Sequence, residues 1–277
     1  MRRLRAVSGV LIALELLTAA PAHAATGQAK TTIRGWLGFS TLALGDINDE
    51  IRSRRDEFLA DTLVDEATWD PFGGAPNLSL ELEVQLTPVL SAGLGVSSQR
   101  GSRRLESFLI YSRDPDTGEP AGVESFDQDL KFSAWDVVGT LGLWVPSAPG
   151  LHFGVQLGLV RGTFERQGTH LYDTGLELPF LEIEQGDWRG TGVVLGAFTG
   201  YEQPLSSTLS LFSRIGYRYR NIRRPDGVLR ISHWGDTGNE RTWESGPLLD
   251  SEGNPMELDL GGFYFNLGLS LGLGARE

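Results

Sequence analysis

The chain has 277 residues, a formal net charge of −12, 36 glycines and no cysteine. The absence of cysteine excludes disulfide scaffolds and thiolate metal sites. Nucleic-acid binding relies on basic side chains that neutralise phosphates, so an acidic chain is a poor candidate for it. We therefore expect no nucleic-acid partner.

The first 24 residues have the order of a secretory signal peptide. Arginines in the first five residues form a positive region, a mostly apolar stretch follows, and Pro21-Ala22-His23-Ala24 offers a cleavage site. The alternative is a transmembrane helix, but the apolar stretch is shorter than the ~20 residues that a bilayer requires. We expect a cleaved signal peptide at 1–24 and one exported domain at 25–277.

In the exported part, apolar and polar residues alternate with a period of two. From Leu78 to Leu86 every second residue is apolar, and Ser79, Glu81, Glu83 and Gln85 stand between them. Successive strand side chains point to opposite faces, so this segment predicts a strand with one apolar face. Its length is about the 9–11 residues that a tilted strand needs to cross a bilayer. The opening segment, roughly 31–44, has an ambiguous phase, and further segments follow at 90–97, 136–145, 151–159, 193–202, 209–220 and 263–273.

The connections between these eight segments alternate strictly between short and long. Short turns fall near 86–90, 145–150 and 202–206, and the polar connections centred on 45–76, 112–123, 166–188 and 223–256 are long. In outer-membrane barrels the short turns face the periplasm and the long loops face outside. We predict an all-β, eight-stranded, antiparallel up-and-down transmembrane β-barrel with short periplasmic turns and long extracellular loops. A soluble exported barrel is the alternative, but it gives no reason for this alternation.

Charged residues lie on the faces opposite the apolar ones. An eight-stranded barrel is just wide enough to be filled by side chains, and placing the polar faces inside leaves an apolar belt for lipid. Buried charges need partners, so we expect an ion-pair network that plugs the lumen; the alternative is a polar lumen that passes small ions or solutes. The predicted network consists of Glu81, Glu83, Glu202, Arg214, Arg218 and Arg220.

The last strand carries the most specific pattern. Asn266, Gly268, Leu271 and Leu273 match the polar-x-Gly-x-x-hydrophobic-x-hydrophobic signal that barrel-assembly machinery recognises. On these residues and its overall pattern, the exported chain resembles the small eight-stranded outer-membrane barrels of the OmpA and OmpX type. It departs from them at the end, where 274–277 follow in place of a terminal aromatic residue. The resemblance implies an outer-membrane location, contact with outer-membrane lipid and assembly by that machinery.

Three histidines of the exported part are candidates for catalysis. His152 lies next to a short turn, His170 lies near Asp173 in a loop, and His233 follows Ser232, whose side chain points the opposite way in a strand. We therefore expect no catalytic residues, no cofactor and no enzymatic activity. Oxygen-bearing residues at 114–119 are spaced like a fragment of a calcium loop, but they equally suit a hairpin turn, and we predict no metal site.

The long connections carry the functional expectation. Apolar spacing predicts a short amphipathic helix over Asn48–Leu63, either above the barrel mouth or as part of a solvated loop. Strand-like residues at 107–112 and 125–132 extend the third and fourth strands beyond the bilayer. We predict a protein of envelope structure or surface interaction that contacts an extracellular or envelope partner through these loops. The alternative is a passive channel or small-solute transporter.

Overall fold

The structure is a computed structural model that describes residues 31–60, 64–113, 120–173, 179–235, 238–250 and 252–273. The predicted signal peptide at 1–24 and the hairpin tip at 114–119 lie outside these ranges. No helix within the described residues is long and apolar enough to cross a membrane.

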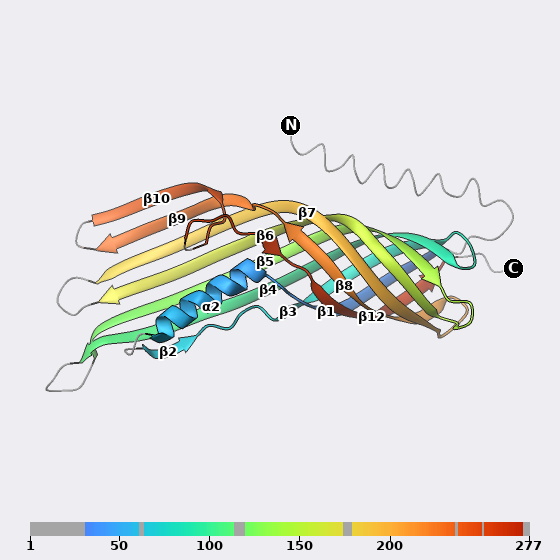
Figure 1. Ribbon diagram of the computed structural model, residues 1–277, viewed down its shortest axis with the longest axis horizontal. Coiled ribbons are helices and arrows are strands. Elements are labelled where there is room, and N and C mark those ends of the chain that lie inside the picture. The colour runs from blue at the N-terminus through green and yellow to red at the C-terminus, as the bar shows by residue number, and fades with distance from the viewer. Residues whose placement is uncertain are drawn as a thin grey trace.

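Eight antiparallel strands form a closed ring (Figure 1). Each strand pairs with the one before it in the ring, and the last pairs with the first, where Leu267 lies opposite Leu37. The predicted eight-stranded up-and-down barrel is therefore confirmed. The ring consists of β1 (Thr31–Thr41), β3 (Gly74–Gln85), β4 (Leu90–Arg113), β5 (Pro120–Trp144), β6 (Leu151–Asp173), β7 (Phe180–Pro204), β8 (Leu209–Ile222) and β12 (Gly262–Gly272).

An apolar belt surrounds one half of the barrel. Its side chains point outward and stay exposed, as the 66% exposed fraction of Leu157 illustrates. On β5 the belt runs over residues 135–143, which matches the ~9–11 residues of a tilted membrane-spanning strand. The belt comprises Leu37, Phe39, Leu78, Leu80, Val96, Trp135, Val137, Leu141, Leu143, Val155, Leu157, Leu159, Val193, Leu195, Leu211, Ile215, Phe263, Phe265, Leu267, Leu269 and Leu271.

Small residues allow the ring to close tightly. A Cβ on Gly158 would lie 2.0 Å from the carbonyl oxygen of Val137, and one on Gly192 would lie 1.8 Å from that of Asn221. A side chain at either position would push neighbouring strands apart, so glycine permits the close backbone approach.

Three tight turns close one end of the barrel, which we call the turn end. Thr87 Oγ1 accepts a hydrogen bond from the Leu90 amide at 3.0 Å, and Ser206 Oγ accepts one from the Leu209 amide at 3.0 Å. Gly150, in the turn between β5 and β6, has a φ of +87°. Residues other than glycine adopt this backbone conformation only with strain.

At the other end, β4 to β7 continue past the belt and form an extension of the sheet (Figure 1). The strand hairpin of β9 (Asp226–Gly235) and β10 (Gly238–Pro247) pairs with the free part of β7 and widens the extension. Shorter strands complete the sheet: β2 (Val64–Thr68) pairs with β4, and β11 (Leu258–Asp259) pairs with β8.

The helix α2 (Gly45–Ala60) lies on the inner side of the extension (Figure 1). It starts three residues before the predicted Asn48 because its first turn is held by tertiary contacts. Asp46, in the first turn, accepts a hydrogen bond from the Glu257 amide at 2.8 Å. The side-chain amide of Asn48 accepts a hydrogen bond from the Phe72 backbone N–H at 2.8 Å and donates one to the Phe72 carbonyl oxygen at 3.1 Å. Ile47 and Ile51 point into the apolar core and are each 3% exposed.

Candidate functional site

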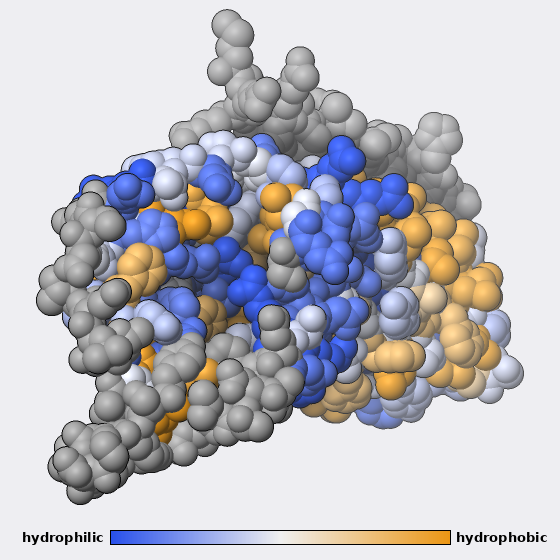
Figure 2. Space-filling view, turned by 60° about the vertical axis from the view of Figure 1, so that its left-hand side comes forward, coloured by the Kyte–Doolittle hydropathy of each residue, from blue (hydrophilic) through white to orange (hydrophobic). Residues whose placement is uncertain are grey.

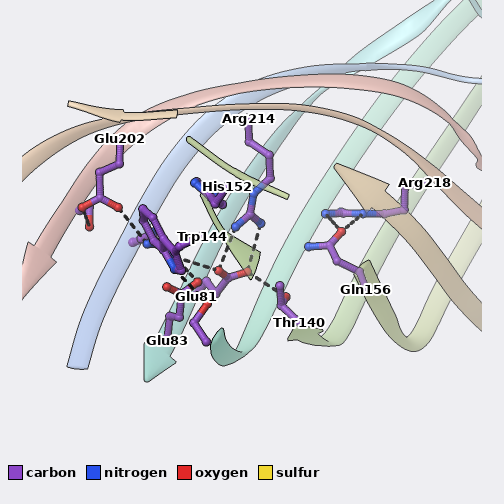
Figure 3. Close-up of polar contacts among 12 residues, drawn as sticks. Glu81, Glu83, Thr140, Trp144, His152, Gln156, Glu202, Arg214 and Arg218 are labelled. Carbon is purple, nitrogen blue, oxygen red and sulfur yellow. Dashed lines mark hydrogen bonds and ion pairs between the residues drawn. The ribbon is translucent and has the colours of Figure 1, made fainter. Parts of the chain in front are cut away.

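Inside the belt, the described residues place eight buried charged side chains in the lumen, which we call the lumen network. Figure 3 labels Glu81, Glu83, Glu202, Arg214 and Arg218 among them. All six residues predicted from the sequence lie there, and the structure adds two that the sequence analysis did not select. The network consists of Arg34, Glu81, Glu83, Asp136, Glu202, Arg214, Arg218 and Arg220.

Arg34 links carboxylates from two distant strands near the turn end. Its guanidinium pairs with Glu83, contacts Glu202 at 2.9 Å and lies 3.6 Å from Glu81. The second oxygen of Glu202 accepts a hydrogen bond from Ser270 at 3.2 Å. One arginine thus connects β1, β3 and β7 across the lumen.

Arg214 forms the most enclosed pair of the network. Its two terminal nitrogens donate to the two oxygens of Glu81 at 3.1 and 3.0 Å, and Thr140 donates to the same carboxylate at 3.1 Å. The guanidinium carbon also lies 3.8 Å from the centroid of the Phe198 ring and 4.9 Å from that of Trp36. Bidentate geometry and aromatic faces both favour arginine over lysine here.

Asp136 holds two arginines at the level farther from the turns. One oxygen lies 3.1 Å from Arg218 and 2.7 Å from Arg220, and it also accepts from Ser97 at 2.7 Å. The Gln156 carbonyl oxygen accepts from Arg218 at 2.9 and 3.1 Å. The network therefore contains four arginines and four carboxylates, which makes it formally neutral.

Arg34 and Asp136 are the functional residues that the sequence analysis missed. Asp136 already stood in an alternating segment opposite Val137, so its inward face was a usable signal. Arg34 was hidden because the inward Trp36 stands next to the outward Leu37 and blurs the alternation of the first strand. His152 is also buried, stacked on Trp144 with ring centroids 4.5 Å apart (Figure 3).

Beyond the lumen network, the inner side changes from charged to apolar. Phe132, Phe164 and Trp188 come from adjacent strands, and the last two have ring centroids 6.2 Å apart. Ile47 and Ile51 of α2 belong to the same cluster. The apolar core consists of Leu42, Leu44, Ile47, Ile51, Trp69, Phe72, Ala75, Leu105, Leu130, Phe132, Ala134, Val138, Val160, Phe164, Trp188, Val194, Ile222, Leu248, Met256, Leu258 and Leu260.

The inner face of the extension beyond this core forms a polar cradle, and Figure 2 shows this end hollowed, with hydrophilic side chains around apolar ones. His170 Nε2 lies 2.5 Å from Glu124, and His233 Nδ1 lies 3.2 Å from Glu182. Strand pairing sets His170 opposite Glu182, and Glu182 opposite His233, so the three form a row across β6, β7 and β9. The polar cradle consists of Glu124, Gln128, Arg166, His170, Glu182, Glu184 and His233.

Arg166 anchors the floor of the polar cradle. Burial lowers its pKa, and the Glu184 carboxylate, 3.3 Å away, opposes that effect. Glu184 also accepts from Gln128 at 3.4 Å, and the Arg166 guanidinium lies 5.7 Å from the centroid of the Trp188 ring. The floor is thus a charged pair supported by the apolar core.

Three of the predicted barrel-assembly residues lie on β12, and the fourth, Leu273, directly follows it. Gly268 packs against the backbone of β1, and Asn266 is buried; with its amide oriented to satisfy both neighbours, it accepts from Trp36 Nε1 at 2.7 Å. Leu271 and Leu273 point outward and are 45% and 50% exposed. Polar and apolar members of the pattern therefore lie on opposite faces of one strand.

Within the described ranges, no three His, Asp or Glu side chains are placed to hold a metal ion. The calcium alternative at 114–119 lies outside the described residues.

The ring, the belt and the charged lumen together define the class of protein. A continuous apolar exterior around buried ion pairs is the reverse of a water-soluble barrel and is the arrangement of an outer-membrane β-barrel. The chain is therefore an integral outer-membrane β-barrel protein with an eight-stranded ring.

Comparisons with known proteins give only distant likenesses to solved structures. No protein-family model and no curated protein matches the chain. Among solved structures, it is similar to Ail, the attachment invasion locus protein of Yersinia pestis, solved with the heparin analogue sucrose octasulfate. The identity is 8%, covering 89% of this chain and 100% of that one, with a TM-score of 0.40. A major outer membrane protein of Thermus thermophilus is 16% identical over 88% of this chain and 99% of that one, with a TM-score of 0.40.

One sequence-based prediction needs correction. The chain was expected not to be an enzyme, yet the outer membrane protease OmpT of Escherichia coli is among the similar structures, with 10% identity, coverage of 89% and 96%, and a TM-score of 0.33. The prediction was wrong to exclude catalysis, because barrels of this general kind include a protease. The likeness itself assigns no activity to this chain.

Proposed function

We propose that the protein holds a ligand-binding surface, the polar cradle, outside the cell on a barrel whose lumen is closed. The observation that carries this proposal is the length of the strands. β5 and β7 each have 25 residues, whereas about ten residues cross a membrane. More than half of each strand therefore lies beyond the belt. Short turns face the periplasm in this class, which puts the extension outside.

The contents of the lumen support a closed barrel over the channel alternative. A depression of about 540 Å³ at the turn end reaches Arg34, Glu83 and Glu202. Above it stand the paired Arg214 and Glu81, then Asp136 with its two arginines, then the apolar core. A solute would have to break buried ion pairs and then pass through packed aromatic rings.

The chemistry of the polar cradle favours a basic ligand. Three glutamates line it against Arg166, and its two histidines already contact two of those glutamates. Arg54 and Glu50 of α2 also act on Arg166, but they pair with each other and add no net charge. Aromatic rings stand beside the carboxylates: Phe126 lies 6.1 Å from His170, and Phe180 lies 5.4 Å from His233, between ring centroids. Carboxylates and aromatic faces together attract ammonium and guanidinium groups. We propose a lysine- or arginine-rich peptide segment as the ligand.

The test measures binding of the refolded barrel to synthetic peptides that differ only in net charge. Basic peptides should bind, and the double substitution Glu182→Gln with Glu184→Gln should weaken binding at least ten-fold. Glu165 provides the control, because it is exposed on the outer face of the extension, on β6 opposite Asp187 of β7; Glu165→Gln should leave binding unchanged. Equal binding of basic and neutral peptides, or steady single-channel conductance in a planar bilayer, would refute the proposal.

A further inference from the structure

A second surface of interest lies on the outside of the barrel, within the apolar belt. A groove of about 920 Å³ crosses β12, β1, β3 and β4, and almost all of its lining is apolar. We call it the lipid groove; Leu269, Gly35, Leu80, Ser98, Arg100 and Trp135 line it.

The groove exists because small residues interrupt two rows of large ones. Strand pairing puts Gly35 between Leu269 and Leu80, and Ser98 between Leu78 and Trp135. A Cβ on Gly35 would meet only the tip of Leu80, at 3.9 Å. The backbone therefore does not require glycine at this position, and the missing side chain leaves space on the lipid side.

A cation stands at the end of the groove nearest the extension. Arg100 is exposed, follows Ser98 on the same face of β4, and belongs to none of the ion pairs among the described residues. Other outward cations are paired: Arg104 with Asp127 at 2.6 Å, Arg189 with Asp187 at 2.5 Å, and Lys131 with Asp129 at 3.6 Å. Arg161, opposite Trp135 on β6, is exposed and also belongs to none of the ion pairs of the described residues, but it does not line the groove. Trp135 is 53% exposed beside the groove, as aromatic side chains are at the membrane interface.

We propose that the lipid groove binds one anionic membrane lipid, with an acyl chain over Gly35 and the headgroup phosphate on Arg100. Lipid tails are as apolar as leucine, so the chain gains packing contacts rather than hydrophobic free energy. The phosphate supplies the selectivity, because a guanidinium can bind it through two charge-assisted hydrogen bonds. This site is independent of the polar cradle and of any ligand there.

Tryptophan fluorescence can measure this preference, because Trp135 lines the groove. The full-length mature protein is refolded in phosphatidylcholine bilayers that contain phosphatidylglycerol or phosphatidylcholine with brominated chains, which quench nearby tryptophans. The Trp135→Phe variant supplies the background from the other tryptophans. One basic residue near a membrane surface contributes about 1 kcal/mol, or about five-fold. Brominated phosphatidylglycerol should therefore quench Trp135 at about one-fifth of the mole fraction that brominated phosphatidylcholine requires.

Two matched pairs of variants separate this site from general attraction to the barrel. Arg100→Ala should bring the ratio of the two quenching mole fractions close to one. Arg161→Ala should leave this ratio unchanged, because Arg161, directly opposite Trp135 on the next strand, does not line the groove. Gly35→Leu should fill the groove and reduce the preference for phosphatidylglycerol at least two-fold. Gly139→Leu should leave that preference unchanged, because Gly139 is a similarly open outward glycine that does not line the groove.

Three results would overturn the proposal. The first is equal quenching by the two lipids, and the second is the same loss in Arg161→Ala as in Arg100→Ala, which indicates diffuse attraction. The third is loss of the preference on adding millimolar inorganic phosphate, which identifies a site for free anions instead of a lipid. A heat-dependent gel mobility shift establishes that each variant is folded before its preference is read.

Discussion

Replacing Glu81 by glutamine tests whether the lumen network stabilises the barrel through charge pairing. The Glu81 side chain is completely buried and accepts hydrogen bonds from Arg214 and Thr140. Glutamine has nearly the same shape, so Glu81→Gln removes one charge and leaves the volume of the lumen almost unchanged. The network then carries four arginines against three carboxylates.

The expected loss follows from the surroundings of Arg214. Its side chain is fully buried, and Glu81 is the carboxylate with which it pairs, at 3.0 Å. Removing one partner of a buried ion pair costs about 3–5 kcal/mol, because the remaining charge stays without compensation. The ring faces of Phe198 and Trp36, whose centroids lie 3.8 and 4.9 Å from the guanidinium carbon, offset part of this loss of stability. A desolvated cation–π contact contributes about 2 kcal/mol. We therefore expect a loss of about 3 kcal/mol, at the lower end of the range.

The double variant Glu81→Gln with Arg214→Met is the informative partner of the single one. It removes both charges, so the network returns to neutrality, and Arg34 keeps Glu83 and Glu202. Replacing a buried pair by apolar groups of similar volume is often neutral in stability. The double variant should regain more than half of the lost free energy of unfolding.

Urea titration of the protein refolded in lipid vesicles measures both effects. Tryptophan fluorescence and the heat-dependent gel shift report unfolding, and the single variant should unfold at lower urea with an unchanged slope. Glu165→Gln, on the exposed outer face, should change stability by less than about 0.5 kcal/mol. The reasoning is refuted if Glu81→Gln lowers stability by less than about 1 kcal/mol, or if the double variant is less stable than the single one.

Three further predictions concern the parts outside the membrane. Asn48→Ala removes the bonds that tie α2 to Phe72, at about 1–3 kcal/mol for the groups left unpaired; trypsin should cleave α2 about ten-fold faster, and an unchanged rate would contradict the contact. Phe164→Ala leaves a cavity beside Trp188 and should lower the free energy of unfolding by about 3–5 kcal/mol in the same urea assay, whereas a loss below ~1 kcal/mol would show a loosely packed core. Replacing Asp226–Pro247 by a short Gly-Ser linker should abolish peptide binding and preserve the heat-dependent gel shift, because β9 and β10 lie outside the ring; a lost shift would show that the barrel needs them.

The ring of strands could be predicted from the sequence because its signal is local. Within nine or ten residues, alternation establishes which side chains face lipid, and the order of short and long connections then determines the neighbours of each strand. The extent of α2 was harder to predict because tertiary contacts hold its first turn. Asp46 bonds the Glu257 amide, 211 positions further along the chain, and no local pattern contains that contact.

The pairing inside the lumen could not be predicted for the same reason. Arg214 and Glu81 are 133 positions apart, and Arg34 and Glu202 are 168 apart. Which charges meet depends on the stagger of all eight strands, which fixes the height of each side chain along the barrel axis. The sequence indicated that charges face inward, but their partners are a property of the closed ring.

A change of face along single strands explains how one sheet serves both membrane and water. On β5 the outward positions are apolar from Leu143 to Trp135, and the inward ones include Thr140 and Asp136. From Ala134 onward the pattern reverses: Phe132 and Leu130 are buried inward, while Lys131 and Asp129 face out.

The register does not shift at this point, so the reversal reflects the surroundings and not the backbone. In lipid, a barrel strand is stabilised by apolar side chains on its outward face, whereas in water it is stabilised by burying them on its inward face. The reversal at 134–135 therefore places the membrane boundary beside Trp135, and the same boundary follows on β6, where outward Leu159 gives way to Arg161 and inward Phe164 is buried. The apolar core begins beside the belt, with Val138 and Val194, and continues past it. The extension therefore has a packed interior, and this allows it to hold a binding surface in a fixed shape.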